Sequence, residues 1–122
     1  MAAAKKNITI ERGAVFAKRF FIVNKSDGSP FDLSGYASAG ESQIRDKAVS
    51  KSVLGNITVL IPSPKTSGEV RYSMSDEETE DLPIGIKEWD LFLIGTTSSG
   101  LGRWRILAGQ AQIVPSVSRD DI

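Results

Sequence analysis

Short stretches in which apolar and polar residues alternate recur along the chain. The clearest covers residues 69–74, where Val70, Tyr72 and Met74 take every second position. Apolar residues spaced by two share one face of a β-strand, so this pattern is typical of a half-buried strand. The same alternation predicts further strands in residues 7–11, 57–61, 86–94, 103–108 and 111–113.

Two other stretches predict strands of a less regular kind. Val15 to Val23 is apolar on both faces, which favours a central strand covered on both sides or a strand with a bulge. Asp27-Gly28 follows it and predicts a turn, because glycine tolerates positive φ and aspartate bonds to nearby backbone. Residues 36–45 then predict a second strand, although small and polar residues weaken its middle.

One segment near residues 75–82 has the pattern of a short helical turn. Ser75 and Glu78 have the spacing of a capping box, in which each side chain bonds to the backbone of the other residue. The acidic residues between them suit the positive end of a helix dipole. Pro83 and Gly85 predict that the helix ends within about two turns.

Together these elements predict an all-β protein. Seven to eight short strands with turn residues between them are typical of an antiparallel β-sandwich, and no alternation of strands with long helices indicates a parallel sheet. We expect residues 1–6 to form a flexible basic arm, residues 7–115 to form a single β-sandwich domain, and residues 116–122 to form an exit tail.

Composition narrows the chemistry that the chain can perform. Its 122 residues include 15 Lys+Arg, 15 Asp+Glu, no histidine and no cysteine. Disulfides, thiolate metal sites, a cysteine nucleophile, a Ser-His-Asp triad and a histidine-based metal hydrolase are therefore excluded. The zero net charge gives no general attraction to nucleic acid or to an anionic membrane.

The apolar segments indicate where the protein folds. No apolar stretch of about seven residues follows Lys5 and Lys6, so the N-terminus lacks the pattern of a secretory signal. No stretch approaches the roughly 20 apolar residues of a membrane-spanning helix. We therefore expect the protein to fold and assemble in a cytoplasm, without a membrane partner.

Two groups of carboxylates resemble chemical sites, but a simpler interpretation explains each of them better. The acidic run from Asp76 to Asp81 lacks the loop spacing and sharp glycine turn of a calcium site, so it is better explained as a solvated helix face. Glu88 and Asp90 share one strand face, as a glycoside-hydrolysing pair would, but the alternation predicts that they face solvent. We expect no catalytic residues, no metal ligands and no cofactor.

The candidate partner interface centres on a mixture of basic and aromatic residues. Arg103-Trp104-Arg105 has residue types that bind single-stranded nucleic acid, but the zero net charge favours a strand with Trp104 inward and both arginines outward. Exposed tryptophan and arginine also anchor protein interfaces, so a protein partner is the better functional alternative. Our candidate interface residues are Trp104, Arg103 and Arg105, followed by Lys5 and Lys6 of the arm.

Charge is also distributed unevenly along the chain. The charged residues within 5–25 are mostly basic, whereas the charged residues within 76–90 are mostly acidic. Subunits could pair through this asymmetry, and the charges would then set the register more than the affinity. Solvated surface charge remains the simpler interpretation for most of these groups.

A series of motifs also suggests a family. In order, these are a strand ending in Arg-Gly (10–13), a Phe-rich strand with an Asp-Gly turn (20–28), Pro-x-Asp-Leu-Ser-Gly-Tyr (30–36), Gln-Ile-Arg-Asp (43–46), Ser-Gly-Glu-Val (67–70), Ser-x-x-Glu-Thr-x-x-Leu-Pro-x-Gly (75–85), Trp-Asp-Leu (89–91) and Leu-x-Gly before a last strand (107–114). This series resembles the immunoglobulin-like N-terminal domain of the phage baseplate upper protein, within the small virion proteins of tailed bacteriophages. The resemblance covers about residues 8–118.

The resemblance implies an immunoglobulin-like sandwich and no enzyme activity. It also implies a tail, baseplate or neck adaptor that docks onto other virion proteins and helps to attach tail fibres or receptor-binding components. Such a protein is expected in the virion, most of all in its tail, after assembly as a homo-oligomer in the host cytoplasm. The alternatives are a capsid decoration protein or a carbohydrate-binding sandwich displayed on the particle, which an exposed Trp89 or Trp104 would favour. A small glycan hydrolase that uses Glu88 and Asp90 is a third.

Overall fold

The computed structural model describes residues 4–47, 52–97 and 100–115. Strands make up most of this part of the chain, with one α-helix and one 3-10 turn. The elements are β1 (Ala4–Lys5), β2 (Ile8–Arg12), β3 (Phe16–Phe21), β4 (Glu41–Arg45), β5 (Gly55–Asn56), β6 (Thr58–Leu60), η1 (Lys65–Ser67), β7 (Glu69–Met74), α1 (Asp76–Glu80), β8 (Gly85–Thr97) and β9 (Gly100–Pro115).

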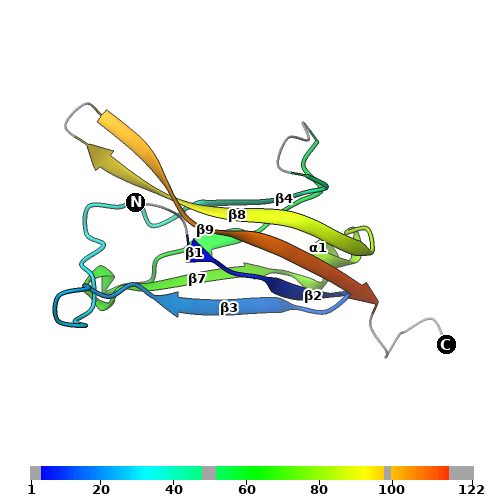
Figure 1. The fold of residues 1–122 in the computed structure, drawn as a ribbon, viewed down its shortest axis with the longest axis horizontal. Coiled ribbons are helices and arrows are strands. Elements are labelled where there is room, and N and C mark those ends of the chain that lie inside the picture. The colour runs from blue at the N-terminus through cyan, green and yellow to red at the C-terminus, as the bar shows by residue number, and fades with distance from the viewer. Residues whose placement is uncertain (1–3, 48–51, 98–99, 116–122) are drawn as a thin grey trace.

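The strands form two sheets that face each other, so the predicted all-β sandwich is confirmed (Figure 1). The large sheet has the order β1-β9-β8-β4-β5, and β2 also pairs with β9. The small sheet has the order β3-β7-β6. Most pairs are antiparallel, as predicted, but β1 and β2 run parallel to β9, which makes the large sheet mixed.

Both sheets contribute their inner faces to one hydrophobic core. At its centre the ring of Trp89, from β8, stacks on the ring of Tyr72, from β7, with 5.6 Å between the ring centroids. Phe16 and Phe20 of β3 approach the same tyrosine at an angle. The other buried apolar residues are Ile8, Ile10, Leu33, Ile44, Ile57, Val59, Ile61, Val70, Met74, Leu82, Leu91, Leu93, Leu107, Ala111 and Ile113.

The predicted helical turn is present as α1, and its capping box is confirmed. Ser75 Oγ accepts a hydrogen bond from the Glu78 amide, and the Glu78 carboxylate accepts one from the Ser75 amide. The buried Thr79 fastens the helix to the segment between β2 and β3, because its hydroxyl donates to Ala14 O at 2.8 Å and accepts from Gly13 N at 3.1 Å. The helix therefore has a fixed position at one end of the sandwich.

The strand predicted for residues 36–45 is shorter than expected, since β4 begins only at Glu41. The preceding residues make isolated bridges instead, from Tyr36 to Gly95 in the large sheet and from Ala39 to Leu60 in the small sheet. The segment thus crosses between the sheets. Gly40 permits this crossing, because a Cβ there would lie 2.5 Å from Phe92 O and 2.9 Å from a Val59 methyl group.

The prediction of a central strand for Val15 to Val23 is wrong. The strand, β3, is the edge of the small sheet, and the side chains of Val15, Phe21 and Val23 are 69%, 55% and 52% exposed. Its inner face packs as expected, with Phe16 buried and Phe20 half-buried. No described strand pairs with the other edge of β3, and the apolar residues of its outer face are exposed.

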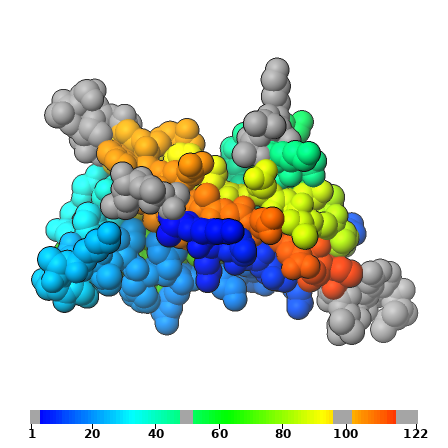
Figure 2. Space-filling view, in the orientation of Figure 1, coloured from blue at the N-terminus to red at the C-terminus, as the bar shows by residue number. Residues whose placement is uncertain are grey.

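The N-terminal arm is also shorter than predicted. Ala4 and Lys5 pair with Leu107 and Ala108 of β9, so these residues belong to the large sheet. Figure 2 shows the N-terminal strands, in blue, lying along the orange β9. The Lys6 amide donates to Ala108 O at 2.9 Å, which continues the attachment toward β2. The remaining predicted arm residues, 1–3, and the predicted exit tail, 116–122, lie outside the described residues.

Candidate interaction surface

The β8–β9 hairpin extends past the end of the sandwich (Figure 1). The sequence pattern predicts strands only in residues 86–94 and 103–108, but the pairing continues through Gly95↔Gly102 to Thr97↔Gly100. A bulge between Leu91 and Phe92 shifts the register, so Leu91 faces Leu107 while Phe92 faces Arg105. The shift places Arg103 and Arg105 beside Ile94 and Phe92, on the outer face of the large sheet.

The side chain of Arg103 is held in place by two neighbours. Its guanidinium lies over the Phe92 ring, 4.2 Å from the centroid, which is a cation–π contact. Its Nε donates to Glu41 Oε2 at 2.8 Å, and this ion pair is largely exposed. An exposed pair contributes little stability, but the two contacts fix the direction in which the cation faces solvent.

Asp90 lies on the same outer face and is half-buried. Burial raises the pKa of its carboxyl, because the ionised form loses water, and the nearby cations of Arg105, Arg103 and Arg45 oppose that rise. Desolvation is the larger effect. This part of the sheet therefore holds a carboxylate that is less well stabilised in the folded chain than in water.

Three of the predicted interface residues come together around one stretch of β9. Lys5 pairs with Ala108, which faces Asp90, so the register places Lys5 on the same outer face as Arg103 and Arg105. All three residues are exposed. We call these three residues the basic stripe. Lys6, which was predicted with them, is also exposed, but its carbonyl turns inward and accepts a hydrogen bond from Trp89 Nε1 at 2.8 Å.

Trp104 does not belong to this exposed group. It pairs with Leu93 on the inner face, is half-buried, and meets the ring of Tyr36 edge on with 5.7 Å between centroids. Gly95 leaves room for both rings, because a Cβ there would lie 2.8 Å from Tyr36 and 3.0 Å from Trp104. The tryptophan therefore supports the base of the hairpin. Trp89, the other candidate for sugar stacking, is buried under Tyr72.

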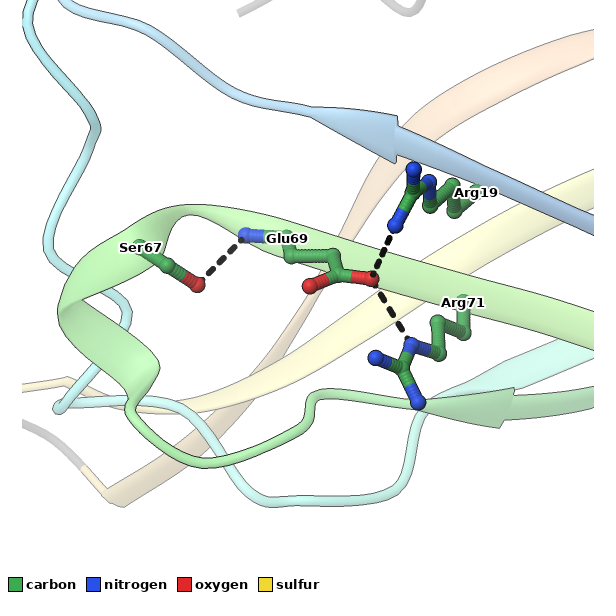
Figure 3. A network of polar contacts seen from close by, with 4 residues as sticks. All are labelled: Arg19, Ser67, Glu69 and Arg71. Carbon is green, nitrogen blue, oxygen red and sulfur yellow. Dashed lines mark hydrogen bonds and ion pairs between the residues drawn. The ribbon is translucent and has the colours of Figure 1, made fainter.

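The sequence interpretation missed a second surface, the outer face of the small sheet. An open hollow of about 630 Å³ lies on this face, and its lining residues are Ala17, Lys18, Arg19, Thr58, Leu60, Arg71, Tyr72 and Ser73. Figure 3 shows the Glu69 carboxylate between two of its cations, with Oε2 2.7 Å from Arg71 Nε and 3.7 Å from Arg19 Nη1. The signal was present in the second apolar face of residues 15–23.

The carboxylates considered for catalysis or metal binding lie on the surface. Glu88 and Asp90 both project from the outer face of β8, on the sheet opposite the hollow. The acidic run from Asp76 is mainly helix α1, and two of its carboxylates, Asp76 and Glu78, accept hydrogen bonds from backbone amides. Among the described residues, no three acidic side chains are grouped closely enough to hold a metal ion.

Comparisons with known proteins leave the family open. Neither the models of known protein families nor the curated protein sequences gave a match to this chain. Within the part of the chain that the structure describes, no helix is long and apolar enough to cross a membrane. The resemblance to the phage baseplate module therefore depends on the order of the motifs.

Proposed function

We propose that this chain is a non-catalytic structural protein of a tailed-bacteriophage virion. It acts as a tail, baseplate or neck adaptor that docks onto neighbouring virion proteins and helps to attach tail fibres or receptor-binding components. It assembles with further copies of itself in the host cytoplasm and stays in the particle, mainly in the tail.

The ordered series of motifs supports the virion assignment, and the observation that supports a docking role is the basic stripe on β1 and β9. Lys5, Arg103 and Arg105 reach one exposed face from two segments that are distant in sequence. Phe92 is half-buried beneath Arg103 and adds an apolar surface that a partner can cover. Arginine beside an aromatic ring is a common anchor of protein interfaces, and its charge orients the incoming partner.

A sandwich displayed for sugar binding has less support. Neither tryptophan offers a fully exposed ring for sugar stacking, because Trp89 is buried and Trp104 is half-buried against Tyr36. A glycan hydrolase needs Glu88 and Asp90 to flank a bound substrate, and both residues lie on an outer sheet face. The capsid decoration alternative differs from the main proposal in location on the particle, which microscopy distinguishes.

Complementation tests the docking role of the basic stripe. A phage that lacks this gene is supplied in trans with the wild-type chain, with Arg103→Ala/Arg105→Ala, or with the charge-matched control Lys25→Ala/Lys47→Ala. We expect the arginine variant to fold and yet lower the yield of infectious particles by at least about tenfold, because interface arginines often carry much of the binding energy. The control should stay near wild type. Full complementation by the arginine variant would overturn the assignment of the docking surface.

A further inference from the structure

The outer face of the small sheet is both apolar and positively charged. We call it the basic face and define it by Val15, Phe21, Leu60, Arg19 and Arg71, which the register of β3, β7 and β6 places on one side of the sheet. All five residues are exposed, and four of them come from β6 and β7 or from within β3. A contiguous exposed apolar patch beside charged groups is typical of a protein contact.

Charge on this face is only partly neutralised within the chain. One carboxylate, Glu69, serves both Arg19 and Arg71 (Figure 3). The hydrogen bond from Arg71 lowers the pKa of Glu69, so this carboxylate is ionised near neutral pH. Two guanidinium groups on this face thus share one carboxylate. The basic face therefore carries a surplus of positive charge and favours an acidic partner.

The same molecule carries a surface of the opposite charge at the end of the sandwich. We call it the acidic end and define it by Glu77, Glu80, Asp81 and Ile84. All four residues are exposed. The three carboxylates make no ion pair with any residue in the described ranges. The acidic end is thus also apolar and charged, and it complements the basic face in both respects.

One copy cannot join these two surfaces by itself. The hydrogen bonds of Thr79 to Ala14 O and Gly13 N fix α1 at the end of the sandwich, and Arg12 Nε donates to Glu80 O at 2.9 Å. The hollow of the basic face lies along β3, β6 and β7 instead. A symmetric pairing of two β3 edges is also disfavoured, because it would bring Lys18 and Arg19 close to their own counterparts.

We propose that the basic face binds the acidic end of a second copy of this chain, head to tail. Helix α1 has five residues, about 7–8 Å of helix, and the hollow of about 630 Å³ has room for several of its side chains. Such a contact leaves one surface of each kind unused at the two ends of a dimer, so it continues into a ring or a filament. The proposal depends on these two surfaces alone, and its failure would leave the virion proposal standing.

Sedimentation velocity of the purified chain tests the contact. We expect species larger than a monomer at about 0.5 mM protein and low salt, a concentration at which even weak contacts are populated. Raising the salt from about 20 mM to about 0.5 M should dissociate them, because the Debye length becomes shorter than the charge separation. A wild-type chain that stays monomeric at low salt would overturn the proposal.

Charge reversal identifies the surfaces involved. Arg19→Glu/Arg71→Glu removes the basic face, and Glu80→Lys/Asp81→Lys removes the acidic end. We expect each variant alone to lose more than about tenfold in self-association. A one-to-one mixture should associate again, because the first variant keeps its acidic end and the second keeps its basic face. The control Lys25→Glu/Lys47→Glu, outside both surfaces and outside the basic stripe, should associate like wild type.

Two results of the charge-reversal experiment would contradict the proposed contact. If either variant associates as strongly as wild type, its surface is not in the contact. If the mixture of two folded variants stays monomeric, the surfaces do not bind each other. Thermal melts of each variant confirm folding, and the salt dependence of the wild type provides a test that needs no variant.

Discussion

Gly109 of β9 lies where the N-terminal segment crosses the sheet, and an alanine there should loosen that segment. A Cβ at this position would lie 2.2 Å from Lys6 O and 2.8 Å from the Lys6 carbonyl carbon. These are backbone atoms, so the clash cannot be relieved by rotating a side chain. We expect Gly109→Ala to push Lys6 and Asn7 away from β9.

The cost follows from the hydrogen bonds at this crossing. Lys6 N donates to Ala108 O, Trp89 Nε1 donates to Lys6 O, and Gln110 N donates to Asn7 Oδ1, at 2.9, 2.8 and 3.1 Å. Each is worth about 1 kcal/mol net, and a buried donor left without a partner costs more. We therefore expect Gly109→Ala to lower the free energy of unfolding by about 2–4 kcal/mol.

Urea denaturation followed by tryptophan fluorescence measures this loss. We expect the midpoint to fall by about 1–2 M, for a slope typical of a small domain. Amide exchange should accelerate at Lys6 and Gln110, whose amides make two of the three bonds. Gly35→Ala is the matched control, because nothing lies within 4 Å of a Cβ there. If the free energy of unfolding of Gly109→Ala lies within about 0.5 kcal/mol of the wild-type value, the crossing does not have this geometry.

Three further changes test other parts of the structure. Asp90→Asn should be more stable than wild type at pH 7, because the folded chain raises the pKa of the Asp90 carboxyl. Its advantage in stability should shrink as the pH falls through the raised pKa toward the ordinary value of 3.8. Paired thermal melts of the two proteins measure this difference. Trp104→Ala should lower the free energy of unfolding by roughly 2–3 kcal/mol, because the contact with Tyr36 is lost. Urea denaturation measures this loss, and an unchanged midpoint would mean that the ring does not stabilise the hairpin. Ser75→Ala should lower the free energy of unfolding by about 1 kcal/mol, because it removes the cap of α1. Ser73→Ala, on the adjacent strand, is the control that shows whether this loss is specific to the cap.

Local pattern predicted the elements whose cause is local. The capping box of Ser75 and Glu78 depends on residues three apart, so it could be found from the sequence. The outward direction of Arg103 and Arg105 followed from strand alternation in the same way. Alternation identifies the face of a side chain but not the neighbouring strand, so the edge position of β3 could not be derived from it.

The other differences arise from contacts between distant segments. The docking of Lys6 depends on the missing side chain of Gly109, about a hundred positions further along the chain. The inward turn of Trp104 was among the sequence alternatives, but its support from Tyr36 depends on a segment that crosses between the sheets. The basic stripe was predicted as separate residues, and only the parallel pairing of β1 with β9 brings Lys5 to the two arginines.

Electron microscopy of intact particles of the source virus, labelled with gold-conjugated antibody against this chain, tests the virion proposal most directly. Mass spectrometry of the same purified particles determines whether the chain is present at all. We predict that the chain is a particle component and that the gold gathers at the tail tip or the neck. Gold spread over the head, or particles that lack the chain, would contradict the proposed role as a tail adaptor.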